Sequence, residues 1–165
     1  EHVYPLEVLA DILGGGASKR LYRALVIDQK LAISAGAHYS GATRGPGRFV
    51  LWASPRPGVP MQPLEQIIET EIAKFIKTSV EVDKLQWAKD RLQAKAVYAR
   101  DSLSARARTL GVALAIGKTI NEVEAWPEGI AAVQTDQIKA AAKTVFRDAK
   151  SVTGLLLPSD NGEGG

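Results

Sequence analysis

The chain has 165 residues, 45% of them hydrophobic, which is enough apolar material for one core that buries about 70% of the unfolded surface. Its net charge of +3, from 21 basic and 18 acidic residues, is too small to indicate a nucleic-acid partner. Because the sequence has no cysteine, disulfides, thiolate zinc sites and cysteine nucleophiles are excluded. No apolar run approaches the length of a membrane-spanning helix, so we expect no membrane partner.

The chain opens with two short amphipathic helices joined by three glycines. Apolar residues recur at helical spacing from Leu6 to Leu13, and Gly14 is the residue type that ends a helix in the left-handed conformation. Ser18 can then accept a backbone N–H as the N-cap of a second helix that continues toward Asp28. The sequence therefore predicts a helix, a glycine corner and a second helix.

Three interpretations of Gly14, Gly15 and Gly16 are available. A phosphate-binding loop is disfavoured, because such loops follow a strand and carry GxxxxGK[ST] or GxGxxG, whereas a helix precedes these glycines. A helix-helix corner that needs small residues remains open. A backbone surface offered to a partner or peptide also remains open.

The next elements are predicted to form a β-hairpin. From residue 31 onward the pattern changes from helical to alternating, and the strand that it predicts has one face of very small side chains. The other face is predicted to consist of Leu31, Ile33, Ala35, Ala37 and Tyr39. Residues 41–47 are dense in turn formers, and residues 48–53 resume the alternation. The proline-rich segment 54–63 is predicted to be a loop.

Helical periodicity dominates the remainder of the chain. A helix is predicted from Pro63 to residue 76, followed by a much longer one over 79–117 with a kink at residues 101 and 102. The basic residues of the long helix are typical of a solvated helix face. Thr119 and Glu122 form a capping box that opens a short helix.

The C-terminal part is predicted to add two helices and a strand. A helical segment covers 128–133, and Thr135 caps a final helix. Residues 152–157, VTGLLL, are predicted to close the fold as a buried strand, and the tail 159–165 is disordered by composition. This order of elements indicates one α+β domain over 1–158, in which helices pack on one face of an antiparallel sheet.

The segment from Leu9 to Leu31 resembles a known family. It contains an apolar helix followed by LGGG, a small residue, Ser, a basic residue and Leu-Tyr, and then a helix that leads into a Leu-Ala strand. These features are similar to those of the C-terminal half-domain of the insulinase/pitrilysin-type zinc metallopeptidases. That group includes the mitochondrial processing peptidases. The resemblance extends over roughly residues 3–158 and implies a LuxS/processing-peptidase-like α+β half-domain. It also implies that the first strand or strands of the sheet precede this sequence.

The chain offers no source for the chemistry of peptide hydrolysis. A zinc site needs about three protein ligands at suitable spacing, as in the HxxEH of this family, but the only histidines are His2 and His38. A nucleophile would lack its base, and Ser18 and Lys19 are adjacent on a helix and face apart. We expect no catalytic residue, metal ligand or cofactor here, and zinc only in another domain or subunit.

The resemblance implies one further functional pair. In many family members an Arg at the end of the second helix and a Tyr seven residues later reach the zinc of the other half and steady the reaction intermediate. In this sequence those positions hold Val26 and Ile33, which cannot donate a hydrogen bond. A complete enzyme of this type would have to obtain the pair elsewhere, for example from a second subunit.

We interpret the chain as the non-catalytic C-terminal domain of a zinc metalloendopeptidase. It would contribute to the substrate chamber and dock against an N-terminal zinc-bearing half or a second family subunit. The candidate contacts for peptide substrate or partner lie beside the strand 31–39, whose edge could add a peptide: Gly14, Gly15, Gly16, Ser18 and Arg20.

Two alternatives remain. One is an inactive scaffold paralogue, and the other is a peptide-binding module with no link to proteolysis. The sequence leaves the substrate open, and the compartment stays open between the periplasm and the cytoplasm of a bacterium.

Overall fold

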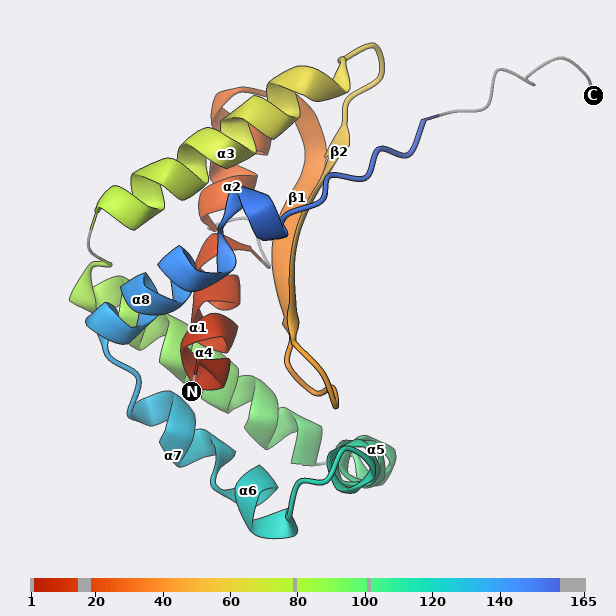
Figure 1. The fold of residues 1–165 in the computed structure, drawn as a ribbon, viewed down its shortest axis with the longest axis vertical. Helices are drawn as coiled ribbons and strands as arrows, with labels where there is room; N and C mark the ends of the chain where they lie inside the picture. Colours follow the sequence, from red (N-terminus) through yellow and green to blue (C-terminus); the bar gives the residue numbers. More distant parts are fainter. Residues whose placement is uncertain (1, 15–18, 79, 101, 158–165) are drawn as a thin grey trace, which may run out of the picture.

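The computed structural model describes residues 2–14, 19–78, 80–100 and 102–157. The chain starts with helices, continues with one β-hairpin and ends with a long helical part (Figure 1). In chain order they are α1 (Val3–Leu13), α2 (Arg20–Tyr22), a π-helix (Arg23–Asp28), β1 (Ala32–Ser40), β2 (Arg48–Pro55), α3 (Met61–Lys77), α4 (Val82–Arg100), α5 (Leu103–Ala115), α6 (Ile120–Glu124), α7 (Trp126–Ala131), α8 (Thr135–Val145) and a 3-10 helix (Asp148–Lys150).

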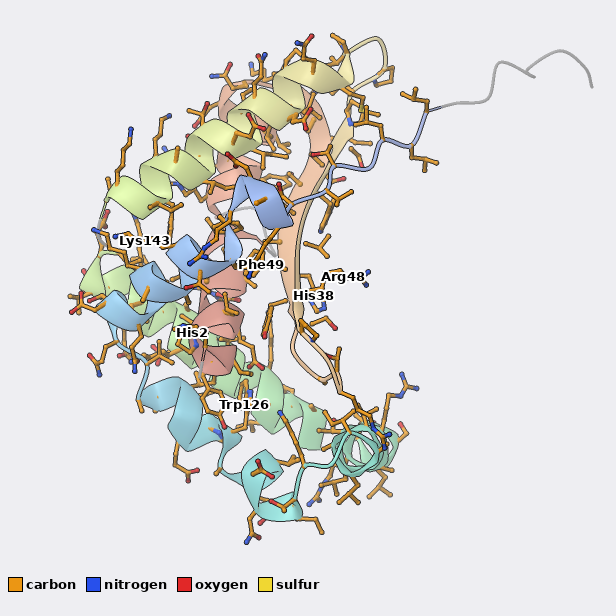
Figure 2. All side chains as sticks on the ribbon, viewed as in Figure 1. His2, His38, Arg48, Phe49, Trp126 and Lys143 are labelled. Atoms are coloured by element: carbon orange, nitrogen blue, oxygen red, sulfur yellow. The ribbon has the colours of Figure 1, made fainter. Side chains whose placement is uncertain are left out.

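The sheet is an antiparallel hairpin with helices on one face, which confirms the predicted α+β class. Strands β1 and β2 pair with Ala37 opposite Leu51 and Tyr39 opposite Phe49, and these residues pack on the core. In Figure 1, α1, α3 and α8 lie on this side of the hairpin. Figure 2 shows Phe49 directed toward the helices, whereas His38 is directed away from them.

A β-bulge interrupts the predicted alternation of faces at the start of β1. The register shifts between Ala32 and Ser34, so Ala32 and Ala35 are both buried. Ile33 is exposed, although it was predicted to share a face with Ala35. The register shift brings Ala32 onto the covered face and turns Ile33 away from it, and this depends on pairing with β2 rather than on local sequence.

The core forms where α1 meets β1, α4, α7 and α8. The large side chains that are fully buried come from α1, α2, the π-helix, α7, α8 and the link between α7 and α8: Val8, Leu9, Leu13, Leu21, Leu25, Ile130, Val133 and Ile138. Helix α1 is therefore the central element of the packing.

The long helix predicted over 79–117 is two helices. Helix α5 has its own N-cap, because the Ser102 hydroxyl accepts a hydrogen bond from the backbone N–H of Ala105 at 3.3 Å. A cap starts a new helix instead of kinking an old one. Leu85 and Ala88 of the predicted stripe are buried, but Leu103 is 84% exposed. The capping box of Thr119 and Glu122 is confirmed at the start of α6.

Three predictions about the C-terminal part differ from the structure. The segment predicted over 128–133 is α7, which begins at Trp126 and has Pro127 in its first turn. Helix α8 has Gln134, not Thr135, as its N-cap residue. Residues 152–157 form no strand and are exposed. Their apolar and β-branched character suits a strand, but a strand needs a neighbour for its backbone groups. The predicted tail lies outside the described residues.

Candidate functional site around the glycine corner

Gly14 ends α1 where the helix meets strand β1. Its φ of −139° and ψ of 174° are extended, so the predicted left-handed conformation is wrong. Glycine is required for a different reason: a Cβ at Gly14 would lie 1.8 Å from the backbone nitrogen of Ala37. The strand backbone occupies the space that any side chain would need. Gly15, Gly16 and Ser18 lie outside the described residues.

A buried carboxylate, Asp11, organises the two sides of the glycine corner. Lys19 Nζ lies 2.6 Å from Asp11 Oδ2, and both side chains are at most 7% exposed. Arg91 of α4 donates to the same oxygen from Nη2 at 2.6 Å and from Nε at 3.0 Å, and Lys95 Nζ lies 3.5 Å from Oδ1. One carboxylate of α1 thus joins Lys19, the residue before α2, to α4.

The charges around Asp11 hold it in its ionised form. Burial by itself would raise the pKa of Asp11, but the hydrogen bonds and positive charges of Lys19 and Arg91 outweigh it and lower the pKa below the ordinary value of 3.8. Separating the partners of a buried ion pair leaves an uncompensated charge, which is costly. Such a pair therefore holds the elements that carry the two partners together. Asp11 therefore ties Lys19, beside α2, to α1 and α4.

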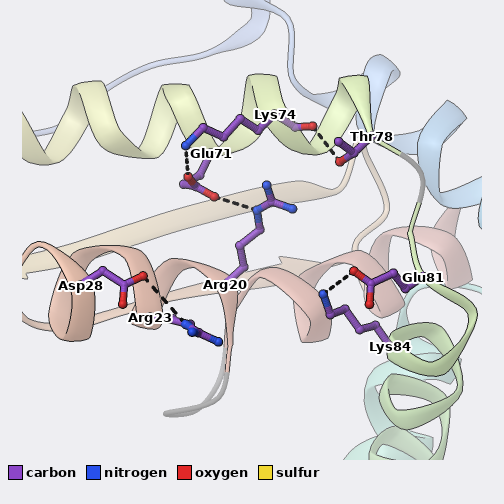
Figure 3. A network of polar contacts seen from close by, with 8 residues as sticks. All are labelled: Arg20, Arg23, Asp28, Glu71, Lys74, Thr78, Glu81 and Lys84. Atoms are coloured by element: carbon purple, nitrogen blue, oxygen red, sulfur yellow. Dashed lines mark hydrogen bonds and ion pairs between the residues drawn. The ribbon is translucent and has the colours of Figure 1, made fainter.

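Arg20, a predicted substrate or partner contact, is engaged within the chain. Its Nε lies 2.8 Å from Glu71 Oε2 on α3, and its guanidinium lies 5.7 Å from the centre of the buried Phe75 ring. Lys74 Nζ reaches the other oxygen of Glu71 at 2.9 Å (Figure 3). Burial would raise the pKa of Glu71, but these two cations lower it. Arg20 ties α2 to α3.

The positions of the expected Arg and Tyr pair lie on either side of the turn into β1. Val26 is in the π-helix and buried, and Ile33 is the exposed bulge residue. Neither side chain carries a hydrogen-bond donor. Between them, Lys30 has a φ of 54°, a left-handed conformation that is unusual for a residue with a side chain. The turn is thus shaped by irregular backbone but presents no donor from these two positions.

The two histidines do not form a metal site. Figure 2 shows His2 at the start of α1 and His38 on the uncovered face of β1. Within the described ranges, no three His, Cys, Asp or Glu side chains are grouped to hold a metal ion. Over the same part of the chain, no helix combines the length and apolar character needed to cross a membrane.

Sequence reasoning missed two polar contacts of α1. One is the Asp11 cluster, and the other joins Trp126 Nε1 to Glu7 Oε2 at 2.6 Å. Burial raises the pKa of Glu7, although the hydrogen bond from Trp126 and the charge of Lys118 act in the opposite direction. The available signal was an acidic residue within an apolar helix, since such a residue needs a partner when the helix is buried. Its partners, distant in sequence, could not be named.

The family of the chain follows from its first half. A family described as "Peptidase M16 inactive domain" matches residues 1–92, more than half of the 165 residues. The chain belongs to this family. The resemblance to insulinase/pitrilysin-type peptidases is thereby confirmed.

Two curated relatives extend the match along nearly the whole chain. An uncharacterized zinc protease of Rickettsia felis is 27% identical over 161 residues, which are 97% of this chain and 38% of the relative. The uncharacterized zinc protease YmxG of Bacillus subtilis is 23% identical over 98% of this chain and 39% of the relative. The chain thus spans about two fifths of the length of these relatives.

Solved structures share the fold of the inactive domain. The inactive peptidase domain of a Bordetella parapertussis protein has a TM-score of 0.85 at 20% identity, over 94% of this chain and 82% of that one. A peptidase M16 inactive domain from Pseudomonas fluorescens has a TM-score of 0.75 at 18% identity, over 87% of this chain and 34% of that one. At these identities the likeness concerns the fold alone.

Proposed function

We propose that this inactive domain is the catalytically silent C-terminal part of a zinc metalloendopeptidase, where it contributes a wall of the substrate chamber and docks against a zinc-bearing half. The observation that carries the proposal is its membership of the M16 inactive-domain family together with relatives named zinc proteases that are much longer. Zinc, the peptide substrate and the chemistry of cleavage belong, in this proposal, to the other half or to a second subunit.

The geometry supports a passive role. The charged side chains of Asp11 and Arg20, near the glycine corner, form hydrogen bonds and ion pairs with other residues of the chain. Val26 and Ile33 offer no donor to a reaction intermediate. If cleavage requires that pair, it must come from another domain or subunit. Losing one such donor commonly costs about 2.7–4 kcal/mol of transition-state stabilisation. Replacing the donors in the domain or subunit that supplies them would therefore cause a measurable loss of activity.

The predicted peptide or partner contacts at Gly14, Gly15, Gly16, Ser18 and Arg20 stay a proposal. Gly14 faces the β1 backbone, and Arg20 is bonded to Glu71. Their contribution is best pictured as support for the neighbouring strand β1. A peptide that added to the edge of β1 by main-chain hydrogen bonds would use that support without contacting Gly14 or the side chain of Arg20.

The test compares the parent polypeptide with this chain alone. We expect the parent to bind stoichiometric zinc and to cleave unstructured peptides until a chelator is added. We expect this chain to bind no stoichiometric zinc and to cleave nothing. Zinc bound to this chain would contradict the proposal, as would full cleavage by a parent that lacks this domain. A parent without zinc or cleavage would favour the inactive scaffold.

A further inference from the structure

Helix α5 is an ordered helix whose apolar side is largely uncovered within the described residues, although Leu110 is half-buried. It lies at the end of the molecule beside the tip of the hairpin (Figure 1). Of its thirteen described residues only Ala113 is buried, whereas Leu103 is 84% and Leu114 54% exposed. Tyr98, in the last turn of α4, is 75% exposed. So much exposed apolar surface on one helix is typical of an interaction site.

The apolar residues of α5 form a helix-packing seam. Leu103, Ala107, Leu110 and Leu114 recur at spacings of four, three and four residues. Such spacing places all four side chains along one stripe, and it is the spacing with which helices pack along one another. The seam therefore fits an amphipathic helix.

Helix α5 is held in place although its seam is open. The Ser102 hydroxyl caps its N-terminus. At its C-terminus, Arg44 from the hairpin tip donates to the carbonyl of Ala115 from Nη2 at 2.6 Å and from Nε at 3.0 Å. A guanidinium at the C-terminal carbonyls also complements the helix dipole. The helix is therefore presented at a fixed place and is not a loose end.

The charges of α5 indicate the character of the partner. Helix α5 contains no Asp or Glu, and Arg106 lies beside the seam, whereas Arg108 lies on the far side of the helix from it. A second copy would therefore bring Arg106 to a helix that has no acidic residue, whereas an acidic helix would pair with it. We propose that the α5 seam docks an amphipathic helix with acidic flanks from the zinc-bearing half of the same parent protein.

The choice of the parent as the source rests on the proposed function and on length. This chain spans only 38% and 39% of the two curated relatives, so most of each relative lies in the same polypeptide beyond the matched part. A tethered domain meets the seam at a high effective concentration, which favours it over a free partner. The seam would then be an internal interface of the parent.

Hydroxyl-radical footprinting tests the proposal, because it measures the exposure of each side chain by mass spectrometry. We expect the labelling of Tyr98 and Leu103 to fall several-fold from this chain to the parent, as it does for residues in an interface core. Trp87 is the internal control, since it is 60% exposed on the first half of α4 and should label equally in both. Equal labelling of Tyr98 and Leu103 in both proteins would overturn the proposal.

Charge reversal separates this occupant from others. In the parent, Arg106→Glu should restore labelling at Leu103, and Leu103→Arg should do the same at Tyr98. The matched control, Lys77→Glu, makes the same change of charge at an exposed position of α3 and should leave the protection intact. Protection that persists after reversal at 106 would overturn the acidic partner.

Two further outcomes are informative. Protection that appears in this chain alone, together with a dimer in analytical ultracentrifugation, would replace the parent by a second copy and overturn the proposal. Zinc-dependent cleavage is assayed on the same samples of parent. Cleavage without protection would sink the docking site alone, whereas protection without cleavage would support docking and contradict the proposed function.

Discussion

Helices α1 and α5 have similar lengths and opposite surroundings. Seven of the eleven residues of α1 are buried, against one of the thirteen described residues of α5. Both carry an apolar stripe, so the stripe does not decide which helix is covered by the chain itself. The difference lies in long-range contacts: β1, α4, α7 and α8 converge on α1, whereas α5 contacts mainly α4 and α6. Each prediction below tests this contrast.

The largest effect is expected at the buried carboxylate of α1. Asp11→Ala removes the shared partner of Lys19 and Arg91 and leaves Lys19 buried without a counter-charge. Breaking a buried pair in this way costs about 3–5 kcal/mol of unfolding free energy. Urea denaturation followed by circular dichroism measures the loss. Asp11→Asn keeps an acceptor and should lose less, because the hydrogen bonds can partly remain.

The control and the pH dependence sharpen this prediction. Glu81→Ala breaks the surface pair with Lys84, whose side chains are 69% and 56% exposed, and should cost less than about 1 kcal/mol. Because the folded pKa of Asp11 is lowered, its stabilisation is present above pH 3.8 and is lost as the pH falls below that value. The Asp11→Ala protein should lack this part of the acid dependence. Equal acid profiles would contradict the role of Asp11.

The next largest effect is expected at the glycine that ends α1. Gly14→Ala places a Cβ against the backbone of Ala37, so α1 and β1 must move apart. Overpacking against a rigid backbone costs about 1–3 kcal/mol. The melting temperature should fall, and amide hydrogen exchange should rise in both α1 and β1. A Gly14→Ala variant as stable as the unsubstituted chain would show that the close approach of α1 and β1 is not needed.

The same substitution on α5 should have the opposite sign. A Cβ at Gly111 would meet no atom within 4 Å, and this glycine has no positive φ. Gly111→Ala should therefore stabilise α5 by about 0.5–1 kcal/mol, the usual difference between the two residues in an exposed helix. Hydrogen exchange of the α5 amides should slow, while exchange in α1 stays unchanged. Faster exchange in α5 would mean that a contact at Gly111 has been overlooked.

Local signals explain what the sequence could predict. The alternation on either side of residues 41–47 predicts the hairpin, and the capping box at Thr119 and Glu122 predicts the start of α6, because each depends on neighbours in the chain. One of the open interpretations of the glycine corner was that it needs small residues, and at Gly14 the structural reason for a glycine is the backbone of β1. That strand lies beyond the range of local patterns.

Contacts between distant segments explain what could not be predicted. Arg91 reaches Asp11 across 80 positions, and no periodicity records such a pair. The bulge at Ile33 follows from pairing with β2. Residues 152–157 have the composition of a strand but pair with no strand among the described residues, so composition alone wrongly predicted a strand there. The part of the candidate site that was missed is therefore the part made by tertiary contacts.

The smallest effect is expected at Leu103, and it distinguishes an open seam from a covered one. In this chain Leu103→Ala should change the unfolding free energy by less than about 0.5 kcal/mol, because the side chain already faces water. Leu9→Ala, the same change in the core, should cost about 2–5 kcal/mol. If the seam is covered in the parent protein, Leu103→Ala should be silent in this chain and destabilising in the parent. A loss in this chain as large as that of Leu9→Ala would mean that α5 packs on the core after all.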